Sequence, residues 1–209
     1  MRYGREGPVR FLSHLDLVKV FERAIRRTPL KAAYTEGFHP RIRMAFASAL
    51  PVGAESIGEW LDLDLDPLDP TDSGAAQQIL NQALPPGLHI LEAREISLPC
   101  KSLGGIIGMS VWQFRGAPDA DTRIPSTLEA SSLPIIRRSQ RRDIRPFIER
   151  LTPQDDGFEA WIRIEQNGSV KPEELLTAMG YLPEERTGIR ATRQALLARS
   201  DSGWIAPWG

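Results

Sequence analysis

The chain has 209 residues, of which 41% are apolar and 25% are charged, and its formal net charge is −1. This length suits one large domain or two of about 100 residues each, and we expect two. No apolar run approaches the ~20 residues that span a bilayer, and the first residues lack the apolar core of a signal peptide, so we expect a cytoplasmic protein with no membrane partner. The single cysteine, Cys100, excludes an internal disulfide and a cysteine-held cluster within the chain, and we expect no metal and no cofactor.

The net charge hides a strong asymmetry along the chain. Residues 1–50 contain ten Lys and Arg against four Asp and Glu, whereas residues 51–100 contain one, Arg94, against nine. Either these segments neutralise each other through internal salt bridges, or they leave a basic face for a phosphate-bearing partner.

The first half of the sequence predicts the order strand, helix, strand, strand, helix, strand. We expect strands over 3–11, 41–46, 59–66 and 88–98, and helices over 14–27 and 73–84. The first helix begins at Ser13, with Asp16 three residues later as in a capping box. One side of this helix is apolar and the other is basic, with Lys19, Arg23, Arg26 and Arg27.

The second half predicts a similar order after a glycine-rich linker over 99–108. Strands are expected over 109–115, 158–165 and 187–197, with strand material around an arginine-rich turn in 133–151 and a helix over 171–179. Residues 117–133 are polar and proline-punctuated, with at most a weak helix. Residues 200–209, with Trp204 and Trp208, form a tail that is either a flexible end or a docking segment. We therefore expect an α+β fold of tandem ferredoxin-like (βαββαβ) domains, 1–98 and 109–199, the second degenerate.

Two histidines lie close together near the start of the chain. His14 falls in the first helical turn, where backbone amides favour an anion, although it is equally explained as a histidine wedged against the sheet. His39 lies in a loop beside Tyr34, Phe38 and Arg41, a combination suited to stacking a base and neutralising its phosphate. The alternative is a rigid turn with Phe38 packed inward. If both histidines faced one cleft, a metal-independent endoribonuclease would be conceivable.

Five arginines occur within nine residues, and three aspartates alternate along a predicted strand. The arginines are Arg137, Arg138, Arg141, Arg142 and Arg145, and such crowding suggests either a solvated hairpin tip or a site for phosphate or an acidic surface. Asp62, Asp64 and Asp66 line one exposed face, so we interpret them as a solvated strand rather than a cation site.

Four motifs carry a resemblance to a known family. They are Arg10 to Leu17, Ala33 to Pro40, Ala45 to Gly53 and Asp143 to Pro146. With them, the chain resembles a radical-SAM-linked bacterial family built on a domain of unknown function. The resemblance implies an accessory unit, because members are fused to, or encoded beside, B12-binding radical SAM proteins.

We therefore expect a non-catalytic accessory module for a radical SAM protein that presents RNA or another phosphate-bearing substrate. An endoribonuclease acting through His14 and His39 is one alternative, and a purely structural subunit is another. The residues expected to bind the substrate or its phosphates are Arg10, Ser13, His14, Lys19, Arg23, Arg26, Tyr34, Phe38, His39, Arg41, Arg43, Arg137, Arg138, Arg141, Arg142 and Arg145.

Overall fold

The computed structural model describes residues 1–66, 71–96 and 99–208. The chain divides into two compact units, unit 1 over Met1–Ile106 and unit 2 over Ile107–Gly209. Each contains helices and antiparallel strands, so the expected α+β class is confirmed. Over the described ranges, no helix is long and apolar enough to cross a membrane.

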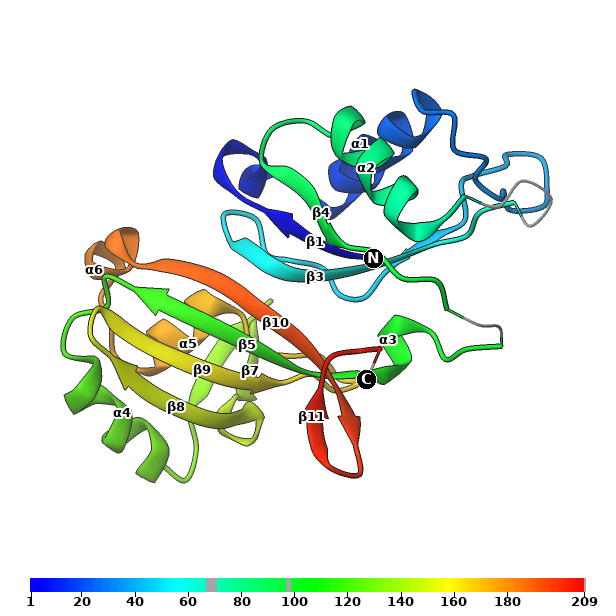
Figure 1. The fold of residues 1–209 in the computed structure, drawn as a ribbon. Coiled ribbons are helices and arrows are strands. Elements are labelled where there is room, and N and C mark those ends of the chain that lie inside the picture. The colour runs from blue at the N-terminus through cyan, green and yellow to red at the C-terminus, as the bar shows by residue number, and fades with distance from the viewer. Residues whose placement is uncertain (67–70, 97–98, 209) are drawn as a thin grey trace. The chain divides into compact units, whose positions relative to one another are not determined.

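Unit 1 is an antiparallel sheet with two long helices on one face (Figure 1). Its strands pair in the order β4, β1, β3, β2. The elements in chain order are β1 (Arg2–Arg5), the 3₁₀ helix η1 (Gly7–Phe11), α1 (His14–Arg26), β2 (Met44–Phe46), β3 (Glu55–Leu63), α2 (Ser73–Ala83), β4 (Leu88–Glu92) and α3 (Leu103–Ile106).

The core of unit 1 lies between the sheet and the apolar side of α1. Leu17, Phe21, Ala24 and Ile25 are buried there, as the helical periodicity predicts, while Val20 is only partly buried. Aromatic rings pack edge to face within this core, Phe21 at 5.3 Å from Tyr3 and 5.5 Å from Phe46. The opposite side of α1 is therefore left to solvent and to its basic residues.

The strand predicted over 3–11 is wrong beyond Arg5. The side chain of Arg5 is fully buried and donates hydrogen bonds to the backbone carbonyls of Val9, Arg10 and Leu12. These bonds turn the chain into η1, whose second residue, Pro8, cannot donate to a sheet ladder. The alternation of residues along the sequence does not predict that the Arg5 side chain binds carbonyls further along the chain.

Other boundaries in unit 1 also differ from the prediction. The regular part of the strand predicted over 41–46 starts at Met44, β3 begins earlier than predicted, at Glu55, and β4 ends at Glu92. Residues 97–98 of the predicted fourth strand lie outside the described residues. The predicted linker is also wrong in part, because Leu103 is buried in the short helix α3 and β5 follows directly at Ile107.

Helix α2 covers the outer edge of β4 through two side chains. The Asn81 amide both donates to the backbone carbonyl of Ile90 (2.9 Å) and accepts from its N–H (2.6 Å). Gln77 donates to the carbonyls of Ile90 and Leu91 at 3.1 and 3.0 Å. These amides occupy backbone groups that an edge strand otherwise presents to solvent.

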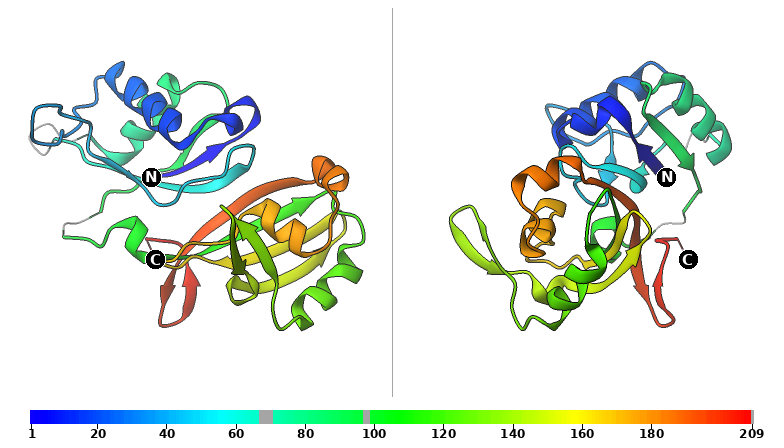
Figure 2. Two further views of the ribbon diagram at one scale, coloured as in Figure 1. Left: turned by 180° about the vertical axis from the view of Figure 1, so that it is seen from behind. Right: turned by 90° about the vertical axis from the view of Figure 1, so that its left-hand side faces the viewer.

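Unit 2 is a second antiparallel sheet with an additional hairpin. The main sheet pairs in the order β11, β10, β5, β9, β8. Among the described residues, strands β6 and β7 pair only with each other, and their hairpin projects from the unit (Figure 2, yellow-green). The elements are β5 (Ile107–Arg115), α4 (Ala120–Glu129), β6 (Pro134–Arg137), β7 (Gln140–Asp143), η2 (Arg145–Phe147), β8 (Ile148–Gln154), β9 (Gly157–Arg163), α5 (Pro172–Ala178), α6 (Pro183–Gly188), β10 (Arg190–Ser200) and β11 (Gly203–Ile205).

Three predictions for unit 2 need correction. The strand predicted over 187–197 begins only at Arg190, because the preceding residues form helix α6. Residues 120–129 form a regular helix, α4, whose internal Pro125 weakens the helical signal in the sequence. The predicted tail contains strand β11, which extends the sheet beside β10. Within it the ring of Trp204 lies so close to Gly108 that a Cβ there would be 2.9 Å from the ring. The tail is thus part of the unit rather than a free end.

Candidate functional site

The start of α1 is a well-formed helix cap. The Ser13 hydroxyl accepts a hydrogen bond from the Asp16 backbone N–H at 3.2 Å and donates to the Asp16 carboxylate at 2.7 Å. The hydrogen bond from Ser13, together with the positive charge of Lys19, lowers the pKa of the Asp16 carboxyl. The interpretation of Ser13 and Asp16 as capping residues is confirmed, since these contacts account for both side chains.

His14 is exposed and lies at the margin of the aromatic core of unit 1. Its imidazole packs edge to face on Phe46, with 5.4 Å between ring centroids, and Phe46 in turn contacts Tyr3 and Phe21. No hydrogen bond or ring contact joins His14 to His39 in the described part of the chain. The histidine pair that the endoribonuclease hypothesis requires is therefore not brought together by contact.

Residues 31–43 form an arm held by backbone hydrogen bonds. The N–H of Arg43 donates to Ala33, and that of Thr35 donates to Arg41, both at 2.8 Å. An isolated bridge pairs Tyr34 with Ile42, whose side chain is buried in the unit 1 core. A further bond, from the Ala33 N–H to the Asp64 carbonyl, ties the arm to the chain beyond β3. The base of the arm is therefore fixed, and its turn over 36–40 is carried outward.

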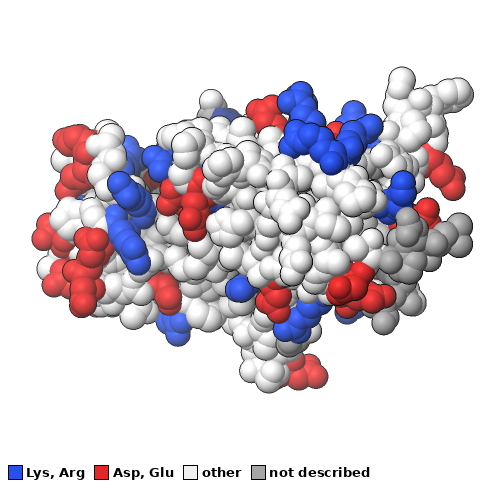
Figure 3. Space-filling model, turned by 45° about the horizontal axis from the view of Figure 1, so that its top comes forward, with Lys and Arg blue, Asp and Glu red and all other residues white. Residues whose placement is uncertain are grey.

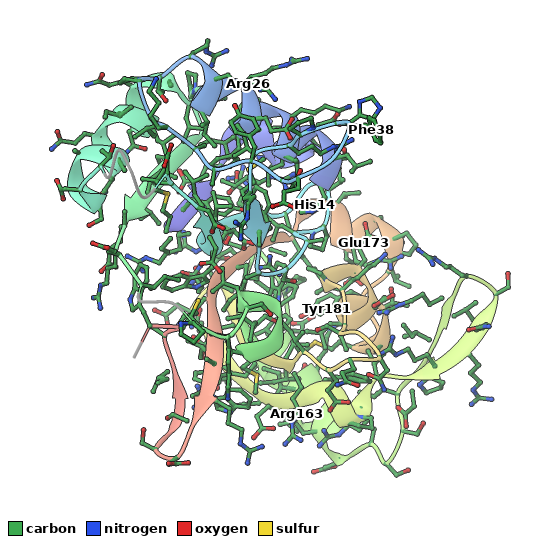
Figure 4. All side chains as sticks on the ribbon, turned by 90° about the vertical axis from the view of Figure 1, so that its right-hand side faces the viewer. His14, Arg26, Phe38, Arg163, Glu173 and Tyr181 are labelled. Atoms are coloured by element: carbon green, nitrogen blue, oxygen red, sulfur yellow. The ribbon has the colours of Figure 1, made fainter. Side chains whose placement is uncertain are left out.

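The arm presents two aromatic rings to solvent. Phe38 is completely exposed (102%), and Figure 4 shows it at the outer margin of unit 1, whereas His14 lies nearer the body. Tyr34 is 46% exposed, and the guanidinium of Arg26 lies 5.8 Å from its ring centroid. The alternative in which Phe38 packs inward is wrong. Both rings are therefore accessible from solvent.

The exposed face of α1 and the arm carry one group of basic and aromatic residues, and Figure 3 shows Lys and Arg gathered on the helix-bearing face of unit 1. Arg23, Arg26 and Arg41 are exposed and make no salt bridge within the described residues. We call the group the α1–arm surface, and its members are Lys19, Arg23, Arg26, Arg27, Tyr34, Phe38, His39 and Arg41. Lys31, an exposed cation on the arm, is not among the predicted residues, although its charge alone could have suggested it.

Three of the predicted cations of unit 1, one of them in the α1–arm surface, have carboxylate partners. Arg10 donates to Glu55 at 3.1 Å and lies over the ring of Phe11. Arg43 pairs with Asp64 at 2.9 Å. Lys19 lies 3.7 Å from the Asp16 carboxylate, but both side chains are more than half exposed, so this pair is weak. Some basic residues of unit 1 are thus neutralised by carboxylates of the same unit, whereas Arg23, Arg26 and Arg41 have no carboxylate partner among the described residues.

Two of the five arginines in the arginine-rich segment of unit 2 are bound by their own chain through hydrogen bonds or an ion pair. Arg137 pairs with Glu174, and Arg145 donates to the carbonyls of Leu128 (2.9 Å) and Ile148 (3.1 Å). Arg138 and Arg141 are exposed near the hairpin tip and make no salt bridge with any described residue. The five arginines therefore do not act as one patch, because the hairpin separates them.

A surface cavity in unit 2 lies away from all predicted site residues. It is lined by residues 116–121 and 153–157, which include Asp119, Asp121, Asp155 and Asp156. Four carboxylates disfavour a phosphate ligand there. Within the described ranges, no three His, Cys, Asp or Glu side chains are placed to hold a metal ion.

The chain is an α+β protein whose first unit exposes basic and aromatic side chains on α1 and the arm. A family model described as "Uncharacterized protein conserved in bacteria (DUF2344)" matches residues 1–172. The chain belongs to this family. The match spans the whole of unit 1, the β6–β7 hairpin and unit 2 as far as the first residue of α5. No curated protein matches the chain.

Proposed function

We propose that the protein is a non-catalytic binding module whose α1–arm surface holds RNA or a similar phosphate-bearing substrate. One observation carries the proposal: Arg23, Arg26 and Arg41 lack a carboxylate partner among the described residues and share this surface with the exposed rings of Tyr34 and Phe38. Phosphates are attracted by the guanidiniums, and unpaired bases stack on the rings.

The layout of α1 supports binding along a chain of phosphates. Lys19, Arg23, Arg26 and Arg27 recur at helical spacing, so they form a stripe on one side of the helix. Arg26 is also held against Tyr34, which reduces the side-chain freedom that binding would otherwise have to restrict. A row of cations beside an aromatic ring suits a single strand of nucleic acid, which has several phosphates and unpaired bases, better than an isolated anion.

We further propose that the module presents its substrate to a radical SAM protein, in line with the resemblance of its motifs. The chain has one cysteine and cannot by itself supply three cysteines for a cluster, so radical chemistry would belong to the partner. The tandem ferredoxin-like arrangement is also part of the proposal. It is supported by the pairing orders β4, β1, β3, β2 in unit 1 and β10, β5, β9, β8 in unit 2.

Fluorescence anisotropy with a labelled single-stranded RNA tests binding. Contacts from Arg23, Arg26 and Arg41 alone predict a slope of about −2 for log affinity against log salt, at roughly −0.7 per phosphate contact. Arg23→Glu and Arg41→Glu should each weaken binding and flatten the slope. Arg199→Glu is the matched control, an exposed arginine of unit 2 that should have little effect. No binding at low salt, or an equal loss in the control, would refute the proposal.

Two further measurements separate the alternatives. RNA cleavage that is lost in His14→Ala and His39→Ala would favour the endoribonuclease. Co-purification with a radical SAM protein that survives nuclease treatment, combined with no RNA binding, would favour a purely structural subunit. The binding module predicts intact RNA and a salt-dependent complex.

A further inference from the structure

The β6–β7 hairpin directs two of its arginines toward the body of unit 2. Directly paired residues of antiparallel strands place their side chains on the same face, and the pairs here are Ile135 with Arg142 and Arg137 with Gln140. Ile135 is buried (6% exposed), so this face is the inner one. Arg137 and Arg142 therefore point inward, unlike the exposed Arg141.

Arg137 is bound along one edge only. Its Nε and Nη2 donate to the two carboxylate oxygens of Glu174, and Nη2 also donates to the Ser169 carbonyl at 2.7 Å. This fork fixes the plane of the guanidinium. Its Nη1 makes no hydrogen bond within the described chain, so one end of the group is still available to an acceptor.

Arg142 is held in place without any counter-charge. Its guanidinium lies over the ring of Phe147, 4.5 Å from the centroid. It forms no salt bridge or hydrogen bond with any described residue, and its Nη2 is buried without an acceptor. Buried guanidinium nitrogens in proteins normally have acceptors, and an exception calls for an explanation. Stacking on Phe147 accounts for the position of the group but leaves its donors unused.

Both guanidiniums meet at the same glycine. A Cβ on Gly168 would lie 3.2 Å from Nη1 of Arg142 and 3.7 Å from Nη1 of Arg137, so these two nitrogens are neighbours. The carboxylate of Glu174 is already used by Arg137 on its other edge. Glu165, in the same turn as Gly168, is exposed and forms no ion pair in the described structure. Of these two neighbouring cations, only Arg137 is paired with a carboxylate among the described residues.

We propose that Arg137 and Arg142 form an oxyanion site beside Gly168 that takes a phosphate monoester. A phosphate carries several acceptor oxygens and close to two negative charges, so it can bind both Nη1 groups at once and offset the excess charge. Gly168 has no side chain to fill the space. The proposal does not rest on the α1–arm surface, because it concerns different residues in the other unit.

Inorganic phosphate is the first probe, titrated into the full-length protein at constant ionic strength with chloride as balance. We expect saturable shifts of the arginine Nε–H signals and a saturable rise in melting temperature. Arg142→Met should abolish both responses, and Arg142→Lys should weaken phosphate binding at least tenfold because an ammonium lacks the planar fork. Arg199→Met, an exposed arginine elsewhere in unit 2, should leave the responses unchanged.

The result that would overturn the proposal is a response that does not saturate, or that is the same in Arg142→Met and Arg142→Lys as in the unaltered protein. Circular dichroism shows whether Arg142→Met is folded, and if it is not, Arg142→Lys decides alone. Competition identifies the source of the phosphate. Preference for a 5′-phosphorylated oligonucleotide over adenosine monophosphate assigns the site to a nucleic-acid end, and the reverse assigns it to a nucleotide. Equal competition by the unphosphorylated oligonucleotide would overturn it.

Discussion

Replacing Arg5 with methionine should loosen the segment that leads into α1. The side chain is fully buried and donates to the carbonyls of Val9, Arg10 and Leu12. Each hydrogen bond from a charged donor contributes about 1.5–3 kcal/mol, while removing a buried cation recovers part of that sum. We expect a net loss of about 3 kcal/mol in the local stability of residues 7–12, which is roughly a hundredfold.

Hydrogen exchange of backbone amides in the full chain measures this loss, because a chain of two units need not unfold in a single step. Exchange should accelerate roughly a hundredfold in residues 7–12 of Arg5→Met. Arg2→Met is the control, since Arg2 lies in the same strand but is only loosely paired with Glu92, at 3.9 Å. Acceleration below about fivefold in Arg5→Met, which corresponds to about 1 kcal/mol, would refute the reasoning.

Three further predictions concern the cap of α1, the ion pair between Arg137 and Glu174, and the close approach of β9 to β5. Ser13→Ala removes the cap of α1 and should lower the stability of unit 1 by about 1 kcal/mol, measured by urea unfolding. Burial alone would raise the pKa of Glu174, but its hydrogen bonds and the charge of Arg137 lower it below 4.5. At acid pH this carboxyl therefore binds more protons in the unfolded chain than in the folded one, so the free energy of unfolding should fall as pH drops below about 4.5. Glu174→Gln should make this fall shallower, which urea midpoints measured at several pH values would show. Gly157→Ala places a Cβ 2.0 Å from the Phe114 carbonyl oxygen at a φ of +131° and should destabilise unit 2 by about 4 kcal/mol, measured by thermal unfolding.

Matched variants sharpen these measurements. Ser131→Ala should have almost no effect, because this serine is exposed and makes no hydrogen bond with the described residues, so an equal loss would contradict the capping argument. Glu173→Gln, next to Glu174 but outside the Arg137 pair, should keep the acid dependence. Gly188→Ala should be tolerated, since no described atom beyond its chain neighbours and its own helix backbone lies within 4 Å of the position that its Cβ would take. A tolerated Gly157→Ala would show that β5 and β9 can shift apart.

A helix can be predicted from the sequence where local signals, such as a cap and a regular apolar repeat, determine it. Helix α1 is predictable almost to the residue, because the cap at Ser13 marks its start and its apolar side repeats with helical spacing. The sequence predicts α4 as a weak helix at most, since Pro125 and polar residues mask its periodicity. The segment after β1 is not predictable in this way, because its shape depends on the buried side chain of Arg5 rather than on local propensity.

The candidate site, too, is predictable from the sequence only where local signals determine it. The α1 stripe is predictable from spacing, whereas the exposure of Phe38 depends on how the arm is tied to Ile42 and Ala33. Among the hairpin arginines, sequence cannot separate Arg137, which binds Glu174, from the exposed Arg141. Whether an arginine can bind a ligand depends on carboxylates that lie far from it in the sequence, such as Glu174 for Arg137.

The amide contacts of α2 with β4 also bear on solubility. A bare edge strand can add the strand of a second molecule and so begin aggregation, and natural sheets often carry features that block this route. Here Asn81 occupies both backbone groups of Ile90, so the edge cannot accept a foreign strand at that point. Asn81→Leu would free the N–H of Ile90, whose carbonyl would still accept from Gln77, and would leave the apolar contacts of α2 intact. Such a variant should remain folded and yet self-associate, which links one side-chain amide to the colloidal behaviour of the whole chain.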